Sequence, residues 1–453
     1  MTFVHTLEYF RFKKIKLKII SKKGKQPMQN FNKFSILYFI VLIIFISAPS
    51  QADPKPGDIF REYHFSDGKG IHLCPEGTMH DSAMFTIYVD DLKSAVRAEL
   101  AGYFHTGHIG TSERKIRIND GKAFNLPASE ISVDNKECYF THLFGRPSVE
   151  VSLKDLKEGE NNLMLFVGPQ ICHSFNWPCY GFHSIILRVY YDNSKPHPTG
   201  KIEYPQNGNV ITSDELMIKT KVHTTQSAIS SVDIVGYYYD YPFEGSGKYL
   251  DWHYLIDEYG RWLGFINRNK KSPYHETWNL EWLADQDEPI KLMARITDMT
   301  GISYMTPAVE NLILKRENHS VKMYKTVNVP ENFKVRVNET MKSYFEPIVN
   351  LPKVSKVQMV SIIPIGHMEN KYFTLCGIND TILKQYKSLP DLHSDFFYNT
   401  YLPVNPGILK EGVNEFFVHS NTDGHMTEVC WPGPALLVRY EQTTRENNKI
   451  LIE

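Results

Sequence analysis

The sequence lacks the short motifs that mark common catalytic centres. It has no Gly-x-Ser-x-Gly nucleophile turn, no His-Glu-x-x-His zinc motif and no glycine-rich loop of the kind that cradles phosphates. Its 51 Asp and Glu residues would always offer some carboxylate pair for glycoside hydrolysis, so their presence decides nothing. We therefore expect a binding or scaffold role rather than a catalytic one.

Most of the chain also lacks an excess of basic residues. Residues 1–52 hold nine Lys or Arg and one Glu, which leaves 41 basic and 50 acidic residues and a net charge of −9 on the remainder. Nucleic-acid binding needs a basic face against the phosphates, so we expect no nucleic-acid partner. No apolar run after residue 52 reaches the roughly 18 residues of a membrane-crossing helix, so we expect no membrane span in the mature chain.

What the sequence does contain is typical of a globular β-rich protein. Hydrophobic residues make up 42% of it and charged residues 22%, which excludes wholesale disorder. The 26 Tyr, 26 Phe and 25 Pro residues favour strands and turns over helices. A length of 453 residues predicts roughly three domains, at about 100–200 residues each.

The N-terminal residues have the pattern of a secretory signal. A lysine-rich stretch precedes an apolar run at residues 34–46, and small residues follow it up to Ala52. The run is shorter than the roughly 20 residues of a membrane-spanning helix. We therefore interpret 1–52 as a signal peptide cleaved after Ala52, begun at Met1 or Met28, with a retained membrane anchor as the alternative. The mature protein is expected in the periplasm or outside the cell.

All six cysteines follow that segment, and an exported protein meets an oxidising environment in which disulfides persist. The predicted disulfide cysteines are Cys74, Cys138, Cys172, Cys179, Cys376 and Cys430. Four lie in the first third, where three connectivities stay open and the short loop from Cys172 to Cys179 favours that pair. Cys376 and Cys430 are the two left for the last third and are expected to pair. A zinc site at Cys172, Cys179 and the nearby histidines is the alternative in the first third.

Five landmarks recur in the same order in the first and last thirds of the chain. They are Gly-His, Ile-Asn-Asp, Leu-Lys-Glu-Gly-x-Asn, Trp-Pro and a final apolar stretch, which begin at residues 107, 118, 156, 177 and 187 and again at residues 366, 378, 409, 431 and 437. Such an order is hard to produce by chance. We therefore predict two copies of one fold on either side of a different middle part.

Each copy has short stretches in which apolar and polar residues alternate, separated by Gly, Pro, Asn and Asp. This period of two with frequent turns is typical of a β-sandwich. The segments VSLKDLKEGENNLMLFV and NPGILKEGVNEFFVHS resemble the strand-turn-strand segment of galactose-binding-like jelly rolls, which are accessory domains beside glycoside hydrolases and in carbohydrate-binding modules. Gly159 lies in the turn of the first segment, where it is free to adopt a positive φ.

The middle part has a different pattern. Its segments PTGKIEYPQNGNVI, ISSVDIVGYYYD and IKLMARITDMTG resemble the bacterial immunoglobulin-like domains of exported proteins. The two resemblances imply an all-β protein of three sandwich domains. The implied domains are a galactose-binding-like jelly roll at 53–194, a bacterial immunoglobulin-like domain at 195–316 and a second jelly roll, a divergent repeat of the first, at 317–445. Trp278 and Trp282 are spaced by four and flanked by leucines, so we expect them in a core or between domains.

The segment 240–251 has acids at its first, fifth and twelfth places, Asp240, Glu244 and Asp251, and a glycine at the sixth. This spacing resembles a calcium loop with oxygen ligands. It departs from that pattern at Pro242 and in the final acid, which is Asp rather than Glu. A hairpin loop without metal is the alternative that the sequence favours, and calcium is the one cofactor that the chain suggests.

Carbohydrate binding is predicted from aromatic residues beside polar ones. Sugar rings stack their C–H faces on Trp and Tyr, while their hydroxyls hydrogen-bond to polar side chains. The candidate residues are Trp252, His253, Tyr254, Arg261 and Trp262 in the middle part and Trp177, Tyr180 and His183 in the first third. Packing in the core is the alternative for each tryptophan.

Taken with the resemblances, these features predict an exported, noncatalytic carbohydrate-binding or accessory protein of a bacterial polysaccharide-degradation system. Its expected partner is a polysaccharide or oligosaccharide. A polysaccharide lyase or glycoside hydrolase is one alternative, and an adhesive or structural surface protein is another.

Overall fold

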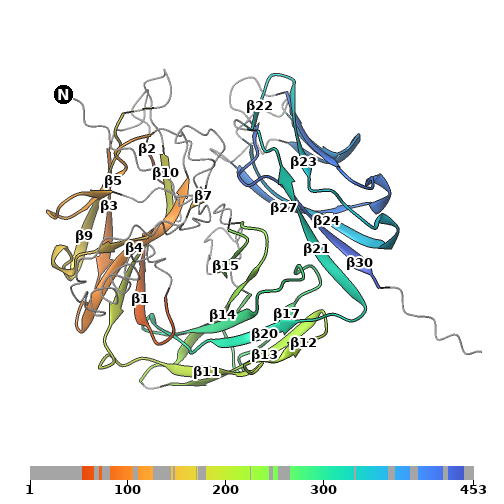
Figure 1. Ribbon diagram of the computed structural model, residues 1–453. Helices are drawn as coiled ribbons and strands as arrows, with labels where there is room; N and C mark the ends of the chain where they lie inside the picture. Colours follow the sequence, from red (N-terminus) through yellow and green to blue (C-terminus); the bar gives the residue numbers. More distant parts are fainter. Residues whose placement is uncertain are drawn as a thin grey trace, which may run out of the picture. The chain divides into compact units, whose positions relative to one another are not determined.

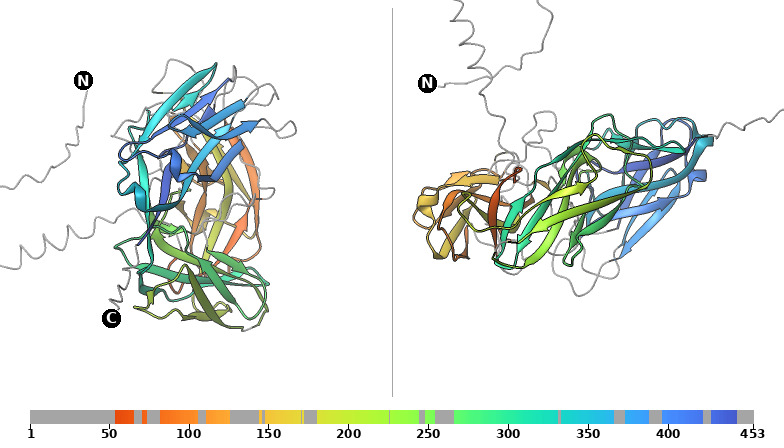
Figure 2. Two further views of the ribbon diagram at one scale, coloured as in Figure 1. Left: turned by 90° about the vertical axis from the view of Figure 1, so that its right-hand side faces the viewer. Right: turned by 90° about the horizontal axis from the view of Figure 1, so that it is seen from below.

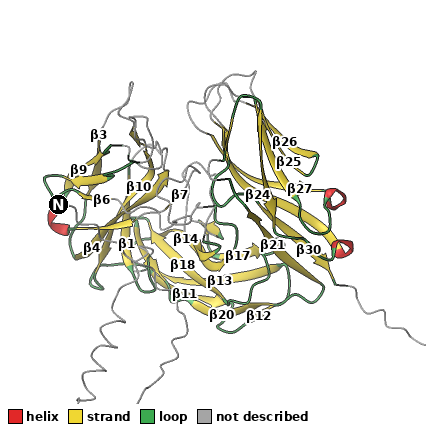
Figure 3. Cartoon of the chain, turned by 45° about the horizontal axis from the view of Figure 1, so that its top comes forward, coloured by secondary structure: helices red, strands yellow, loops and turns green. Residues whose placement is uncertain are grey.

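The computed structural model describes residues 54–65, 71–73, 82–105, 111–125, 144–145, 148–169, 171, 180–224, 226–243, 248–253, 266–330, 333–365, 373–387, 396–421 and 427–442. Strands make up nearly all of the regular structure in these ranges, and the helical part consists of three short 3-10 turns, η1 (Leu153–Asp155), η2 (Leu351–Lys353) and η3 (Pro406–Ile408) (Figure 3). The prediction of an all-β protein is confirmed. None of these turns could span a bilayer. The predicted signal peptide lies outside the described residues.

Two sheets pack face to face in the first third (Figure 1). One contains β1 (Ile59–His64), β2 (Ile71–Leu73), β4 (Ala95–His105), β7 (Phe144–Gly145), β8 (Ser148–Val151) and β10 (Tyr180–Tyr191). In it β10 lies between β1 and β4, and β4 pairs with β8. The other contains β3 (Ser82–Val89), β9 (Gly159–Phe166), β5 (Lys115–Ile118) and β6 (Phe124–Asn125), in that order. Alternate residues of the strands, such as Leu163 and Leu165, fill the core between the sheets.

The last third repeats this strand order. One sheet has β30 (Ala435–Glu441) between β21 (His319–Val327) and β24 (Val354–Ile365), and β24 pairs with β27 (Phe396–Val404). The other layer contains β23 (Glu339–Phe345), β28 (Glu415–Ser420), β25 (Phe373–Ile378) and β26 (Thr381–Lys387), in that order, and the end of β21 pairs with β23 to join the two layers. Two short strands, β22 (Lys334–Val335) and β29 (Thr427–Glu428), extend the first sheet. Figure 2 shows these strands, in cyan to blue, as two layers from other directions.

The Ile-Asn-Asp and Leu-Lys-Glu-Gly-x-Asn landmarks make the same hydrogen bonds in both thirds. Asn119 donates through Nδ2 to Asn161 Oδ1 at 2.9 Å, and Asn379 donates to Asn414 Oδ1 at 3.0 Å. Asn161 and Asn414 are fully buried, and each bonds the backbone N–H and C=O of the residue four places before it. Asn119 and Asn379 both have positive φ, at 47° and 52°, which asparagine tolerates better than most residues.

The middle part has its own core. Its strands are β11 (Thr199–Tyr204), β12 (Val210–Ile211), β13 (Glu215–His223), β14 (Ile229–Tyr239), β15 (Leu250–His253), β16 (Asn267–Asn269), β17 (His275–Asn279), β18 (Ile290–Asp298), β19 (Ile302–Met305) and β20 (Val309–Leu314). A three-stranded sheet, β11-β13-β17, packs on the sheet in which β18 joins β14, β19 and β20. Trp278 is buried in this core, which confirms its predicted role.

The first third and the middle part share a continuous sheet, because β19 pairs with both β1 and β18. Apolar side chains from both parts also form a small common cluster, in which Phe60 and Tyr190 contact Val235, Met293 and Met305. All described residues accordingly belong to one compact unit, Ala52–Glu453. The domain boundaries at residues 194 and 316 therefore stay a prediction.

The hairpin between β14 and β15 packs on the last third. Tyr241 is buried, and its hydroxyl donates to the Gly433 carbonyl at 2.6 Å. Phe243, Tyr249 and Trp282 pack against the same cluster as Tyr241, which covers one face of β21, β24 and β30. The prediction that Trp282 lies in a core or between domains is thus confirmed, and the aromatic side chains of the hairpin have a packing role.

The expected disulfide between Cys376 and Cys430 is wrong, because both cysteines are free and buried. Cys376 lies on β25 and faces the core between the two sheets of the last third. Cys430 lies in the cluster of Tyr241, on the opposite face of the sheet that contains β21, β30 and β24. A sheet therefore separates the two thiols. Cys74, Cys138, Cys172 and Cys179, together with the zinc alternative, lie outside the described residues.

Candidate functional site

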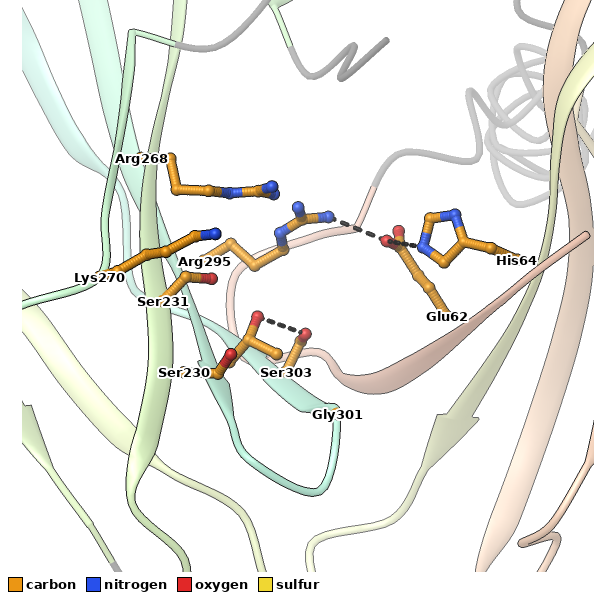
Figure 4. A pocket seen from close by; sticks show the side chains of 10 residues that line it. Glu62, His64, Ser230, Ser231, Arg268, Lys270, Arg295, Gly301 and Ser303 are labelled. Atoms are coloured by element: carbon orange, nitrogen blue, oxygen red, sulfur yellow. Dashed lines mark hydrogen bonds and ion pairs between the residues drawn. The ribbon is translucent and has the colours of Figure 1, made fainter. Parts of the chain in front are cut away.

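A polar cavity of about 260 Å³ lies where β1 meets the middle part (Figure 4). Its lining residues belong to β1, β14, β16, β18 and β19. Two more come from the residue after β16 and from the turn between β18 and β19. The described lining residues are Glu62, His64, Ser230, Ser231, Arg268, Lys270, Arg295, Thr297, Gly301 and Ser303. None of them has a large apolar side chain, so the cavity suits a polar ligand.

Three of the lining residues, Glu62, Arg268 and Arg295, belong to a network of buried ion pairs. Arg295 donates through Nη1 to Glu62 at 3.1 Å and through Nε and Nη2 to Asp233 at 2.9 and 2.7 Å. Arg268 donates to Asp233 through Nε and Nη2 at 2.7 and 3.1 Å. Arg188 donates to Glu62 through Nε and Nη2 at 3.0 and 2.8 Å. These lining residues are therefore held in place by charge-assisted bonds.

Strand register explains how these side chains meet. Asp233 on β14 lies directly opposite Arg268 on β16 and Arg295 on β18, and Glu62 on β1 lies directly opposite Arg188 on β10. Side chains at opposite positions of neighbouring strands are close enough to pair. Each ion pair therefore follows from the register of two strands, except that between Glu62 and Arg295.

The arginines determine the charge state of the carboxylates. Burial by itself would raise the pKa of Glu62, but Arg295 and Arg188 outweigh it and hold that pKa well below its ordinary value. Burial would likewise raise the pKa of Asp233, and Arg295 and Arg268 hold it below its ordinary value. Both carboxylates are thus ionised at neutral pH.

Hydroxyl groups line another part of the cavity. Ser230 and Ser231 belong to β14, and the pairing of β14 with β18 is irregular between Ile229 and Ser231. An extra residue there lets two consecutive serines line one cavity, which regular alternation would prevent. Ser231 is only 7% exposed, and its hydroxyl has no hydrogen-bond partner among the described residues. The nearby hydroxyls of Thr297 and Ser303 bond each other at 2.8 Å.

Lys270 adds a positive charge that the network does not balance. Arg188 is ion-paired with Glu99 as well as Glu62, and Arg97 pairs with Glu99 and Asp58, so four arginines face four carboxylates. The Lys270 side chain extends into the cavity, as do those of Arg268 and Arg295 (Figure 4), and its ammonium has no ion pair with any described residue. His64 on β1 lies with Nε2 at 3.7 Å from Glu62 Oε2.

The predicted calcium loop joins the paired strands β14 and β15, and its residues 244–247 lie outside the described residues. The strands on either side pair in antiparallel fashion, and the Asp240 N–H donates to the Tyr249 carbonyl at 2.7 Å. Asp240 and Asp251 each accept the backbone N–H of the following residue. Glu244 lies outside the described residues, and within them no group of three His, Cys, Asp or Glu side chains could hold a metal ion. Calcium binding here therefore stays a prediction.

The predicted carbohydrate residues do not form one surface in the described part of the chain. Tyr180 is fully buried and donates to the Phe166 carbonyl at 3.0 Å, and His253 is 4% exposed and packs on the Tyr238 ring at 4.1 Å between centroids. Neither offers a ring face to a sugar. Trp252 packs partly buried beside Tyr237 and the cluster shared with the first third. The remaining candidates, Trp177, Tyr254, Arg261, Trp262 and the side chain of His183, lie outside the described residues.

The cavity residues themselves were missed by reasoning from motifs. A signal was present, because Asp233 interrupts an apolar run in β14 and Arg295 interrupts another in β18. A charged residue inside a buried strand requires a partner of opposite charge. What the sequence does not contain is the register that makes Arg268 and Arg295 the partners of Asp233.

Comparisons with known proteins find only weak similarity. No family model matches the chain, and no curated protein matches it. A beta-porphyranase of glycoside hydrolase family 86 from the human gut bacterium Bacteroides plebeius aligns with a TM-score of 0.22 and 12% identity, over 56% of this chain and 39% of that one. A DUF4785 family protein from Legionella pneumophila aligns with a TM-score of 0.23 and 8% identity, over 93% and 89% of the two chains. PNGase F, a glycosylasparaginase from Flavobacterium meningosepticum, aligns with a TM-score of 0.19 and 7% identity, over 85% and 96%. The chain thus spans well under half the length of the porphyranase, and these distant resemblances assign no function.

Proposed function

We propose that this protein is exported and binds a polysaccharide or oligosaccharide without cleaving it. In this proposal residues 1–52 are removed as a signal peptide, and the mature chain consists of two jelly-roll domains around an immunoglobulin-like one. The repeated strand order of the first and last thirds supports that division. N-terminal sequencing of the exported protein tests the cleavage, and a start before residue 53 would contradict it.

The observation that carries the binding role is the hydroxyl-lined cavity. Ser230, Ser231, Thr297 and Ser303 supply hydrogen-bonding groups to it, and Arg268 and Lys270 supply charged donors. A saccharide presents many hydroxyl oxygens in a small volume and is bound by such polar groups. The Ser231 hydroxyl makes no hydrogen bond to another described residue, so it can bond to a ligand oxygen.

The same cavity argues against glycoside hydrolysis. That reaction requires one carboxylic acid that donates a proton and a second carboxylate nearby. Glu62 is the one carboxylate among the described lining residues, and Arg188 and Arg295 keep its pKa well below the ordinary value. It is therefore ionised at neutral pH and holds no proton to donate.

Affinity gel electrophoresis with a panel of plant and marine polysaccharides tests the proposal. Retardation by at least one polysaccharide, with no release of reducing ends on incubation, is the expected result. Unchanged mobility in every gel, together with co-purification of a protein partner, would favour an adhesive or structural role instead. Release of reducing ends would establish a hydrolase.

A lyase is the second candidate, because His64 lies in the same cavity as Arg268, Lys270 and Arg295. Lyases remove a proton next to a carboxylate, and cationic side chains stabilise the charge that develops there. The ultraviolet absorbance of an unsaturated product reports this reaction. Absorbance that rises with the wild-type protein and not with a His64→Ala variant would replace the noncatalytic proposal with a lyase.

A further inference from the structure

We infer that the cavity between β1 and the middle part selects an anionic substituent, a carboxylate or a sulfate, of the bound saccharide. Lys270 would pair with its charge, and the hydroxyls of Ser230 and Ser231 would donate to its oxygens. This inference rests on the proposed saccharide-binding function and adds the class of ligand. It is carried by the charge and the unpaired donors of the cavity.

Three cationic side chains extend into the cavity. Arg268, Lys270 and Arg295 all line the cavity and come from β16, the residue after it and β18 (Figure 4). Glu62 is ion-paired with Arg295, and Asp233 is ion-paired with Arg268 and Arg295. Lys270 has no ion pair with the described residues. Cations that share a partly enclosed space repel one another, and a bound anion removes that repulsion.

Two of the hydroxyl groups in the cavity lining are available to a ligand. Thr297 and Ser303 bond each other, whereas the side chains of Ser230 and Ser231 have no hydrogen-bond partner in the described residues. Carboxylate and sulfate groups have several acceptor oxygens and no donor of their own. The hydroxyls of Ser230 and Ser231 can donate to such a group, although they can also accept from a neutral sugar. The Lys270 ammonium only donates and carries a charge, so it is the group that favours an anionic substituent over a neutral one.

The geometry also excludes a divalent cation as the preferred occupant. A hard cation needs several oxygen ligands with negative charge. Glu62 is the sole described carboxylate in the lining, and two arginines already bind it. The excess positive charge of Lys270 would repel a metal ion.

Paired polysaccharides test the inference on the full mature protein. Affinity gels would contain polygalacturonate or its carboxyl-reduced form, and dextran sulfate or dextran, at matched ionic strength. We expect tighter binding to the charged member of at least one pair, and the pair that shows it identifies carboxylate or sulfate as the source. Equal binding of both members of each pair would overturn the inference while the proposed function stands.

Single-residue variants test whether the anionic group binds in this cavity. We expect Lys270→Ala to weaken binding of the charged polysaccharide about tenfold and Ser231→Ala to weaken it about threefold or more. Lys201→Ala is the matched control for an exposed lysine, because Lys201 lies on β11 outside the cavity lining. Ser343→Ala is the matched control for a buried serine, since its hydroxyl is also without a partner among the described residues. Equal losses in Lys270→Ala and Lys201→Ala would show nonspecific charge attraction and overturn the inference.

Thermal unfolding with sodium sulfate, compared with sodium chloride of equal ionic strength, separates the two proposals. A sulfate-dependent rise in the melting temperature that Lys270→Ala loses, in a protein that no polysaccharide retards, would support the anion site and contradict the saccharide-binding function. No sulfate effect and no preference for charged polysaccharides would contradict the anion site.

Discussion

Glu62 and Arg295 are 233 residues apart in the sequence, and their side chains meet at 3.1 Å between Oε2 and Nη1. Glu62 belongs to the first third and Arg295 to the middle part, and β19 pairs with the strands that carry both. The candidate cavity lies at this junction, so it exists only while the two parts stay together. The stability of the junction and the capacity to bind are therefore linked.

Replacing Glu62 by alanine should destabilise the protein strongly. The change leaves Arg188 and Arg295 without their shared carboxylate, while their side chains stay nearly buried. Removing one partner of a buried ion pair costs about 3–5 kcal/mol when the other charge is left unpaired. Arg188 keeps Glu99 and Arg295 keeps Asp233, so we expect a loss at the lower end of that range, about 3 kcal/mol. Thermal unfolding followed by circular dichroism measures the effect. The exposed pair of Glu203 and Lys221 provides the control, since Glu203→Ala should melt close to the wild type. Similar melting temperatures for both variants would contradict a structural role of the network.

Acid should weaken the same network. The pKa values of Glu62 and Asp233 are lower in the folded protein than their ordinary values of 4.5 and 3.8. A carboxylate with a depressed pKa stabilises the fold fully above its ordinary pKa and loses this contribution as the pH falls below it. We therefore expect the melting temperature to fall as the pH is lowered from about 5 to about 3. A Glu62→Gln variant does not titrate at this position, so its melting temperature should change less over that range. Parallel curves for the two proteins would show that Glu62 contributes nothing to acid sensitivity.

The buried asparagines of the two thirds should be equally important. Asn161 and Asn414 each make hydrogen bonds to the backbone of a turn and accept one from Asn119 or Asn379. Replacing either by alanine leaves buried backbone groups unpaired, which costs about 2–4 kcal/mol in total. Calorimetric unfolding of Asn161→Ala and Asn414→Ala should show similar losses.

A neighbouring asparagine supplies the control for this comparison. Asn162 is exposed, and its side chain accepts a hydrogen bond from the Thr86 hydroxyl at 2.9 Å. Asn162→Ala should therefore change the melting temperature little. A large loss for Asn161→Ala with none for Asn414→Ala would contradict the equivalence of the two turns.

The sequence predicted the β-structure and the equivalent turns better than it predicted the site. The alternation of apolar and polar residues is local, as in the segment around Leu163 and Leu165, and it determines which side of a strand is buried. The ion pair of Glu62 with Arg295 depends on the pairing of β1 with β19, which no local pattern records. Trp252 and His253, which follow the 240–251 segment, suggested a binding surface. Composition does not distinguish a ring that contacts ligand from one that packs on another part of the chain, as Trp252 does on the cluster shared with the first third.

Cys376 and Cys430 should behave as thiols despite the exported setting predicted for the chain. An even number of cysteines supports pairing only when two of them share a face, and here a sheet lies between them. Burial raises the pKa of the Cys376 thiol to about 11, and it also raises that of Cys430, so both should resist alkylation in the folded protein. Alkylation in denaturant without reductant, followed by peptide mass spectrometry, should label both residues. A peptide that joins Cys376 to Cys430 and disappears on reduction would contradict the structure of the last third, because a bond between them would require one thiol to cross the sheet.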